Sequence, residues 1–282
     1  MNGSIFGIYG LGLIGGSLAI AIKTYIPDSK VYGFGRDANK LENAKNLGLI
    51  DGYGDENSPF VADLDFFIIS TPIDTVPVIF SKFMPFLKED VIVMDVGSVK
   101  RCVLEEVNKI NLRNLYFVGT HPMTGSEKSG CEFARADLFD KKIVGILTET
   151  PQEILPVVRD FWKSLGAQIV LISADFHDEI VAITSHFPHL IASAICNYLE
   201  KDGWADAKFF GLYGKGLLDT TRIAQGNPEM WTEIIMRNAD NIERALVDFS
   251  KEIDVLIHII RNNKRKELME FLTRGKEFRE KL

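Results

Sequence analysis

The chain has 282 residues, of which 46% are hydrophobic and 25% are charged, and its formal net charge is −7. This balance is typical of a folded globular protein and excludes a mainly disordered chain, a collagen-like chain and a coiled-coil rod. Because there is no excess of basic residues to neutralise phosphates, the composition also argues against a nucleic-acid-binding protein.

The first feature along the chain is an uncharged stretch, residues 3–22, which is long enough to cross a membrane. Six of its residues are glycines, and no lysine or arginine precedes it as one would in a signal peptide. We therefore predict a buried strand over residues 4–9, a glycine turn and a buried helix over residues 15–25. No other stretch resembles a membrane span, so we expect no membrane partner.

Short apolar runs alternate with helical patterns over the first 172 residues. The runs are apolar throughout, as expected for strands covered on both faces. They lie at residues 4–9, 30–34, 65–70, 91–96, 116–120, 143–148 and 167–172. The helical patterns lie at residues 15–25, 37–47, 75–86, 101–108 and 151–165. This alternation predicts an α/β, Rossmann-type dinucleotide-binding domain over residues 1–172, built on a mostly parallel, doubly wound sheet.

The pattern changes after residue 172, and no good strand follows. Long stretches with helical spacing of apolar residues cover residues 175–199, 228–261 and 264–281. Either Ser173 or Asp175 caps the first of these helices. We expect an all-α domain over residues 173–282. Its strongest apolar stripe serves either its own core or a dimer partner, and consists of Ile242, Leu246, Phe249, Ile253, Leu256 and Ile260.

The three cysteines, Cys102, Cys131 and Cys196, lie far apart and include no CxxC pair. An odd number of separated cysteines fits no disulfide framework. We expect free thiols and a cytoplasmic location, where thiols stay reduced.

The glycine motif between the first strand and the first helix predicts a dinucleotide site. Gly10 permits the tight turn, Gly12 lets the backbone approach a pyrophosphate, and Gly15 lets the helix pack against the strand. Leu13 and Ile14, together with Gly15, open the helix whose N-terminal N–H groups hold the phosphates. The alternative is a glycine-rich turn with only a structural role.

The end of the second predicted strand bears on the choice between NAD and NADP. About 20 residues after the glycine motif, NAD-binding chains carry an acidic residue that binds the ribose 2′-hydroxyl. Here that place holds Gly35, followed by Arg36, whose guanidinium can pair with the 2′-phosphate of NADP. Asp37 leaves the question open, because it can accept from the 2′-hydroxyl or cap the following helix. The cofactor is therefore NADP or NAD, with NADP mildly favoured.

Polar side chains stand at the ends of three predicted strands: His121 at one, Ser98 at the next, and Ser70, Thr71 and Pro72 at the third. Ligands of open α/β sheets bind at the carboxyl ends of strands, so we expect these residues around one crevice. Ser70, Thr71 and Pro72 then lie beside the nicotinamide half of a dinucleotide. His121 can take a proton near neutral pH, although a histidine that merely hydrogen-bonds at a strand end is the alternative.

His186 and His189, three residues apart in the first long helix, suggest a metal site. No carboxylate or third histidine stands at ligand spacing, so we expect no metal. Pro188 between them should distort the helix and free backbone carbonyls, and we expect this face to line the crevice. Arg222 can grip a carboxylate with two parallel hydrogen bonds, or form an ordinary salt bridge with Asp219.

Six motifs occur in order along the chain: GLGLIGGS at residues 10–17, DVGSVK at 95–100, GTHPMTGSEKSG at 119–130, SHFPH at 185–189, DTTRIA at 219–224 and NPEMW at 227–231. Together they resemble the prephenate dehydrogenase family, which is closely similar to the arogenate dehydrogenases. The match covers essentially the whole chain, and the combination is far more specific than any single motif. The resemblance implies a dinucleotide-binding domain followed by a helical dimerisation domain, and a homodimer formed through that domain.

The resemblance also implies an activity in tyrosine biosynthesis. The small-molecule substrate prephenate is oxidatively decarboxylated to 4-hydroxyphenylpyruvate and CO2, with hydride transfer to NAD or NADP. Because the product is aromatic, loss of hydride and CO2 is strongly driven. The enzyme has mainly to position the substrate, take one proton and hold two carboxylates.

Roles for individual residues follow from the resemblance. It implies that His121 accepts the proton of the ring hydroxyl and that Ser98 orients that hydroxyl. It implies that Arg222 pairs with the ring carboxylate and that His189 contacts the pyruvyl side chain. Two further residues lie around the substrate with less certain roles: Ser126 and Lys128.

This chain departs from the family pattern at two places. NAD-specific members carry an aspartate where this chain has Gly35, which puts simple NAD specificity in doubt. Lys215 stands where many members have a glycine-rich loop, and either adds a charge to the pocket or points to solvent. We also expect no fused chorismate mutase or regulatory domain.

Three other functions remain open. The first is an NADP-dependent arogenate dehydrogenase that gives tyrosine directly, although a His189 that donates to a keto acid mildly favours prephenate. The second is a 2-hydroxyacid or imine reductase, which typically has a lysine on the first long helix of the second domain, where residues 175–199 contain none. The third is a catalytically silent NADP-binding sensor, which is disfavoured because the polar constellation is intact.

Overall fold

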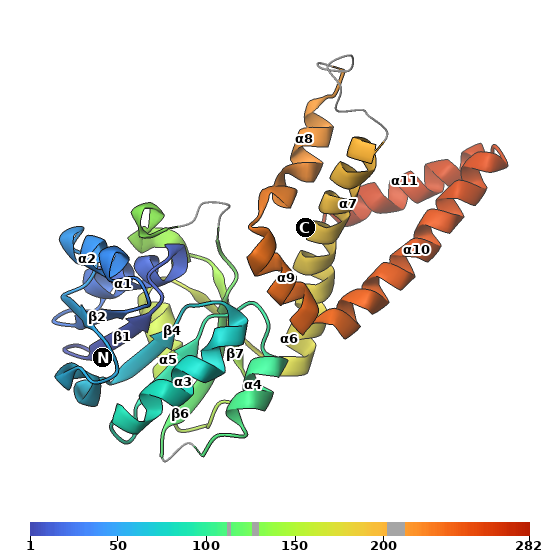
Figure 1. Ribbon diagram of the computed structural model, residues 1–282. Helices are drawn as coiled ribbons and strands as arrows, with labels where there is room; N and C mark the ends of the chain where they lie inside the picture. Colours follow the sequence, from blue (N-terminus) through green and yellow to red (C-terminus); the bar gives the residue numbers. More distant parts are fainter. Residues whose placement is uncertain (112–113, 126–129, 202–211) are drawn as a thin grey trace.

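The computed structural model describes residues 1–111, 114–125, 130–201 and 212–282. Two parts follow each other along the chain: an α/β part, which ends with β8 (Gln168–Ile172), and a helical part, which begins at Ala174. In Figure 1 the helical part projects from one side of the α/β part, and α10 and α11 extend furthest from the sheet.

The described residues form one eight-stranded sheet in the order β3-β2-β1-β4-β5-β6-β7-β8. Neighbouring strands are parallel except β6 and β7, which are antiparallel. The strands are β1 Ile5–Tyr9, β2 Lys30–Phe34, β3 Gly52–Gly54, β4 Phe66–Ile69, β5 Ile92–Asp95, β6 Tyr116–Pro122, β7 Ile143–Leu147 and β8 Gln168–Ile172. Every apolar run predicted as a strand forms one, and the mostly parallel sheet is confirmed.

Helices cover both faces of this sheet. They are α1 Leu13–Tyr25, α2 Ala38–Asn46, α3 Val76–Phe83, α4 Arg101–Val107 and α5 Leu155–Ser164. Short 3-10 turns join them to the strands: η1 Pro59–Asp63, η2 Ile73–Thr75, η3 Met84–Phe86, η4 Cys131–Phe133 and η5 Ala136–Phe139.

Alternate side chains of the central strands are buried on opposite faces of the sheet. On β4, Phe66 and Ile68 belong to the core under α1 and α5, whereas Phe67 and Ile69 belong to the core under α3 and α4. Burying a side chain of this size contributes about 1.5–3 kcal/mol. Because both faces are covered, the strands are apolar throughout, which is the pattern that predicts them.

The short strand β3 is the one strand that the sequence pattern does not predict. Two of its three residues are glycines, so it has no apolar run, and it pairs with β2 alone at the end of the sheet. Strand β3 therefore forms because it pairs with β2, and not because its residues favour an extended backbone.

The helical part begins with one long, interrupted helix. Ser173 accepts from the N–H of Phe176 at 3.4 Å and so caps α6. A π turn separates α6 from α7 and ends just before Pro188, which cannot donate a backbone hydrogen bond. The segments of the helical part are α6 Ala174–Val181, η6 Ala182–His186, α7 Phe187–Lys201, α8 Lys215–Thr221, η8 Arg222–Gln225, α9 Pro228–Arg237, α10 Ala239–Arg261 and α11 Arg265–Arg279.

The helix expected over residues 228–261 is two helices. It breaks at Asn238, which is fully buried and has φ −126° and ψ 28°, outside the helical region. Its side-chain amide donates to the backbone carbonyl of Asp178 at 2.7 Å and lies 3.3 Å from Nδ1 of His186. These contacts with a distant part of the chain stabilise the break. The sequence pattern also does not predict the short helix α8.

Most of the apolar stripe of α10 is not fully buried within the described chain. Its first residue, Ile242, is buried, but Leu246, Ile253 and Ile260 are 38%, 40% and 62% exposed. Figure 1 shows α10 and α11 extending away from the other elements as a helical hairpin. The stripe therefore does not serve the core of this chain.

One helical run, Ala174–Lys201, is long and apolar enough to cross a membrane by length and composition. The sequence pattern does not single it out. It carries four buried polar side chains: His177, Asp178, His186 and His189. The first three bond to other parts of the protein. The run is the central helix of the helical part.

Candidate active site

The glycine turn after β1 is shaped by close backbone packing. Gly10 has φ 95°, and a Cβ added there would lie 2.4 Å from the carbonyl oxygen of Ser70. A Cβ added at Gly15 would lie 2.0 Å from the carbonyl oxygen of Gly10. At Gly12 a Cβ would meet nothing within 4 Å. Gly10 and Gly15 are thus required by the turn, whereas Gly12 faces open space, where a ligand can approach the backbone.

The N-terminus of α1, where Leu13 and Ile14 stand, is suited to an anion. Its cap residue Gly12 has no side chain to bond the first N–H groups, and the first turn has no acidic residue. Free N–H groups and the helix dipole together favour a phosphate there. The neighbouring strand β4 is followed by Ser70, Thr71 and Pro72, of which Ser70 donates its N–H to the carbonyl of Tyr9 at 2.8 Å.

The end of β2 gives Asp37 a structural role. Its carboxylate accepts from the N–H groups of Asn39 and Lys40 at 3.0 and 3.3 Å, so it caps α2. Gly35 is half-buried and Arg36 is exposed. Of the two roles that the sequence leaves open for Asp37, the structure has the helix cap.

A buried lysine connects the ends of β5 and β6. Nζ of Lys100 donates to the carboxylate of Asp95 and, at 2.8 Å, to the carbonyl of Thr120. Both charged groups are almost completely buried, and burial raises the pKa of Asp95 although Lys100 opposes this shift. Sequence reasoning did not single out Lys100, although it is the last residue of the DVGSVK motif.

Ser98 lies in a loop that is fixed on both sides. Gly97 donates its N–H to Asp95 Oδ2 at 2.9 Å, and Lys100 donates its N–H to Asp178 Oδ1 at 2.8 Å. Ser98 is half-buried between these two anchors. The loop therefore places Ser98 at the same edge of the sheet as the end of β6.

His121 lies inside β6, which extends two residues beyond the predicted strand end at residue 120, and pairs with Gly145 of β7. Its Nδ1 is 2.8 Å from Nε2 of His177, and Nδ1 of His177 is 2.7 Å from Oδ1 of Asp178. Three titratable side chains thus form a hydrogen-bonded chain. His177 and Asp178 lie on α6, and no local pattern in the sequence pairs them with β6.

Burial lowers the pKa of His121 and His186 and so favours their uncharged forms. It lowers the pKa of His121 well below its ordinary value, with further lowering from His177, Lys100 and His186. Burial also lowers the pKa of His186 to about 4, although the Asp178 carboxylate opposes this shift. His121 is therefore neutral near pH 7 and able to accept a proton.

On the helical side, His189 stacks on Trp231 of α9, with ring centroids 3.7 Å apart and an angle of 13°. A Cβ added at Gly226 would lie 2.3 Å from Nε1 of Trp231, so this glycine makes the stack possible. Nδ1 of His189 is buried without a hydrogen-bond partner among the described residues, and burial lowers the pKa of this ring. His189 is only 5% exposed, so its ring orientation is set by packing.

Helix α9 brings this side against the end of β4. Ile234 and Trp231 belong to the same apolar core as Ile73, which lies one residue beyond Pro72. The stacked pair of His189 and Trp231 is thereby held near the strand end expected beside the nicotinamide. The structure brings together the glycine turn, Ser98 and His121 at one edge of the sheet, and α9 covers part of that edge.

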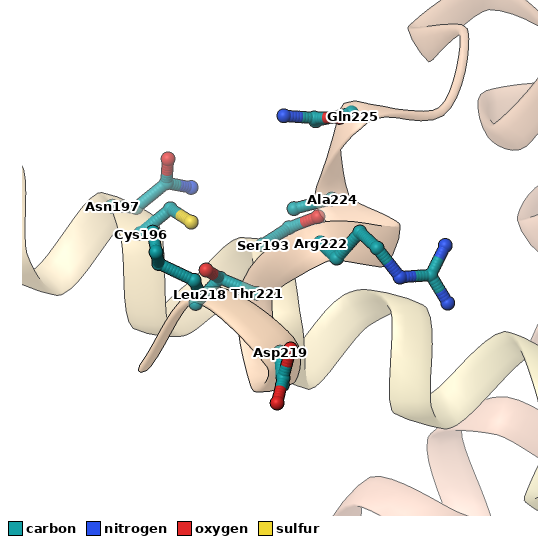
Figure 2. Close-up of a pocket in the computed structure, with 9 residues that line it drawn as sticks. All are labelled: Ser193, Cys196, Asn197, Leu218, Asp219, Thr221, Arg222, Ala224 and Gln225. Carbon is teal, nitrogen blue, oxygen red and sulfur yellow. The ribbon is translucent and has the colours of Figure 1, made fainter. Parts of the chain in front are cut away.

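Arg222 lines a cavity of about 540 Å³ between α7 and the turn after α8 (Figure 2). The other lining residues are Ser193, Cys196, Asn197, Leu218, Asp219, Thr221, Ala224 and Gln225. In Figure 2 the guanidinium extends away from the other labelled side chains, the Asp219 carboxylate included. Ser193 is one helical turn beyond His189 on α7, so the cavity continues the face that carries this histidine.

The remaining predicted site residues are placed as follows. Ser126 and Lys128 lie outside the described residues. Lys215 is the first residue of α8 and is exposed. Within the described ranges, no three His, Cys, Asp or Glu side chains are grouped so that they could hold a metal ion.

Two family models match the chain. The prephenate dehydrogenase nucleotide-binding domain matches residues 18–171, and the prephenate dehydrogenase dimerization domain matches residues 173–274. The chain is 33% identical to the cyclohexadienyl dehydrogenase of Zymomonas mobilis over 253 residues, which is 88% of this chain and 86% of the relative. It is 30% identical to the prephenate dehydrogenase of Bacillus subtilis over 279 residues, covering 97% of this chain and 74% of the relative.

Solved structures have the same fold. The prephenate dehydrogenase of A. aeolicus, in complex with hydroxyphenyl propionate and NAD+, matches with a TM-score of 0.90 and 32% identity, over 98% of this chain and 97% of that chain. The arogenate dehydrogenase of Synechocystis matches with a TM-score of 0.83 and 30% identity, over 98% and 99% of the two chains. Relatives named for both substrates are thus similar to this chain along almost its whole length.

Proposed function

Since this chain belongs to the prephenate dehydrogenase family, we propose that it oxidatively decarboxylates prephenate to 4-hydroxyphenylpyruvate. The observation that carries the proposal is that Ser98 and a hydrogen-bonded His121 stand at the ends of the neighbouring strands β5 and β6, at the sheet edge that also holds the glycine turn. A base, a hydroxyl and an anion-binding turn at one edge suit a hydride transfer coupled to loss of a proton.

The sheet side of the site carries the chemistry. Ser98 orients the ring hydroxyl of the substrate, and His121 takes its proton as the ring carbon loses hydride. The bond to the ring carboxylate then breaks, CO2 leaves with the ring becoming aromatic, and His121 returns the proton to the ring oxygen. The fixed loop around Ser98 and the buried Lys100 hold these groups in position, so little reorganisation accompanies the reaction.

The helical side binds the carboxylates. Arg222 is the basic residue of the cavity beside α7 and pairs with the ring carboxylate through two parallel hydrogen bonds. His189, held against Trp231, borders the pyruvyl side chain. Ser126 and Lys128 complete the surroundings of the substrate in this proposal.

The residues of the glycine turn fit a nicotinamide dinucleotide, because Gly12 faces open space and the first turn of α1 is uncapped. When bound, this cofactor accepts the hydride. We propose a preference for NADP, because Asp37 is engaged as a helix cap while Arg36 is exposed at the place of the 2′-phosphate. Replacing Arg36 with alanine should weaken NADP binding about ten- to hundredfold and leave NAD binding unchanged. Equal effects on the two cofactors would contradict the preference.

Arogenate is the second candidate substrate. The observation that favours it is the similarity to the arogenate dehydrogenase of Synechocystis, which has the same fold and matches almost the whole chain.

The decisive experiment is the initial rate of reduced-nicotinamide formation with prephenate and with arogenate, each with NAD and with NADP. Turnover of prephenate supports the proposed function, and turnover of arogenate alone moves the second candidate to the front. Dinucleotide binding without turnover of either substrate would contradict both and indicate a silent binding protein. The ratio of the NADP and NAD rates decides the cofactor preference.

We also propose that the chain forms a homodimer through α10 and α11. The match to a dimerization domain supports this, as do large apolar side chains left exposed on both helices, among them Ile260 and Leu272 at 62% and 61%. Light scattering should give twice the chain mass. Replacing both residues with glutamate should produce monomers, and a monomeric unmodified chain at micromolar concentration would contradict the dimer.

A further inference from the structure

We propose that His177 and Asp178 are positioning residues that hold His121 with its proton on Nδ1, so that Nε2 is the atom that takes the substrate proton. The inference rests on the proposed function, in which His121 is the base. It concerns residues that neither the motifs nor the comparisons assign a role, and it follows from hydrogen-bond polarity along one chain of side chains.

The chain begins at a carboxylate that can only accept. Asp178 is fully buried on α6. Its two oxygens accept the backbone N–H groups of Lys100 and Arg101, at 2.8 and 3.0 Å, at the start of α4. Two N–H donors and the positive end of a helix stabilise the ionised carboxylate. Nδ1 of His177, 2.7 Å from the same carboxylate, must therefore donate its proton to it.

This donor fixes the next ring. A neutral imidazole with its proton on Nδ1 has a lone pair on Nε2. Nε2 of His177 is 2.8 Å from Nδ1 of His121, and two lone pairs at that distance would repel. Nδ1 of His121 must donate, which leaves the lone pair of His121 on Nε2. The second nitrogen is the one not occupied by His177, so it is the one that can meet a substrate hydroxyl.

The arrangement also serves the reaction after the proton is taken. Protonation at Nε2 turns His121 into an imidazolium, whose Nδ1 proton is already donated to His177. The negative charge of Asp178 lies one ring further along the chain and stabilises that cation. If both nitrogens of His177 carried a proton, Nδ1 of His121 would have to accept a hydrogen bond. The proton of His121 would then be on Nε2, the nitrogen toward the substrate, and this nitrogen could not act as the base.

Among the described residues, the titratable or charged groups near His121 belong to this account: Asp95 at the end of β5, Lys100 before α4, His177 and Asp178 on α6, and His186 on the π turn η6. Burial is the main reason that a charge on His121 is disfavoured in the free enzyme. His121 is therefore uncharged before the reaction, and its tautomer decides which nitrogen is basic.

The test uses two substitutions at His177 in the full chain. His177→Phe keeps a ring but removes both nitrogens, and we expect kcat with prephenate to fall about ten- to hundredfold with KM unchanged. His177→Gln can present its amide oxygen to Nδ1 of His121, and we expect most of kcat to return. Asp178 is a poorer target, because it also caps α4 and its loss would destabilise the fold. Thermal unfolding checks that both variants remain folded.

A double variant separates positioning from a structural role. In a His121→Asn background, adding His177→Phe should change kcat no further, because the partner that His177 positions is absent. An equal loss in both backgrounds would overturn the proposal. So would a His177→Gln variant as slow as His177→Phe with both folded.

A spectroscopic measurement keeps the proposal independent of the assigned substrate. Nitrogen-15 chemical shifts of His121 in the labelled full chain should show a protonated Nδ1 and an unprotonated Nε2, and His177→Phe should abolish this preference. The reverse tautomer in the unmodified chain would overturn the proposal whether or not prephenate is turned over. Failure of the unmodified chain to oxidise prephenate would instead contradict the proposed function and leave the tautomer result standing.

Discussion

The α/β part and the helical part differ in how completely they bury their apolar side chains. In the α/β part, the aromatic rings of Phe6, Phe66 and Phe161 pack against one another in a closed core, and the buried Lys100 is paired with a carboxylate. In the helical part, most of the stripe on α10 is exposed or half-buried. The α/β part thus has a closed apolar core of its own, whereas the helical part leaves an apolar surface for a second one.

The site lies where these two parts meet and shows the same contrast. Its sheet side, with Ser98, Lys100 and His121, is fixed by hydrogen bonds before any substrate binds. On its helical side, His189 stacks on Trp231 and Arg222 lines a cavity. This contrast predicts that the sheet side governs the rate of the reaction and the stability of the fold, and that the helical side governs binding.

The largest effect should follow from His121→Asn. We expect kcat to fall about 10²- to 10⁴-fold while the KM for prephenate changes little, because the base is lost and the carboxylate contacts remain. Steady-state kinetics with saturating cofactor measure both constants. Turnover equal to that of the unmodified chain would show that His121 is not the base. It would also contradict the prediction that the sheet side of the site governs the rate.

The next effect concerns the closed character of the α/β part. Lys100→Met should lower the free energy of unfolding by about 3–5 kcal/mol, because it leaves the buried carboxylate of Asp95 without its cation. Chemical denaturation measures this change. The double variant with Asp95→Asn should be less destabilised than the sum of the two single variants. A loss of stability below about 1 kcal/mol would contradict the burial of this ion pair in the structure.

The pH dependence of stability tests the buried histidines at the junction. Burial lowers the pKa of His186 to about 4, so between that value and an unfolded value near 6.5 the unfolded chain binds the extra proton. Stability should therefore fall as the pH drops through this range, by about 3 kcal/mol for this group. His121 shifts in the same direction. Denaturation curves of His186→Gln should show a shallower fall, and identical pH profiles would refute this assignment.

The smallest of these effects should be on the helical side. Arg222→Ala removes two charge-assisted hydrogen bonds to the ring carboxylate and should raise the KM for prephenate about ten- to hundredfold. We expect kcat to change much less. The matched control is Arg244→Ala, which removes an exposed guanidinium elsewhere in the helical part and should leave KM unchanged. An unaltered KM in Arg222→Ala would refute the carboxylate role.

The sequence predicts most of the fold because the relevant signals are local. Continuous apolar runs predict strands covered on both faces, and the glycine spacing predicts the turn before α1. The pattern fails where distant contacts decide the conformation. Gly52–Gly54 becomes a strand only beside β2, and the helix over residues 228–261 breaks at Asn238 because that side chain bonds to residues about 50 to 60 positions away.

The candidate site divides in the same way. His121 and Ser98 can be found from strand ends, since topology brings such ends to one edge of a sheet. His177 and Asp178 cannot, because their partners lie 56 to 78 positions away in the sequence. The available signal is that His177 and Asp178 fall on the same helical face as the apolar residues Ala174 and Val181, where an unpaired carboxylate would be costly.

The hydrogen bonds of Asp178 have a mechanical consequence. They tie α6 to the start of α4, and His177 ties it to β6, so α6 moves as one body with the sheet although it follows the last strand. The start of α10 is tied to the same body, because Asn238 donates to the carbonyl of Asp178 and Arg101 pairs with Asp240. Any motion of the helical part is then confined to the segments that lie further from the sheet. Such motion would leave the base and its partners undisturbed.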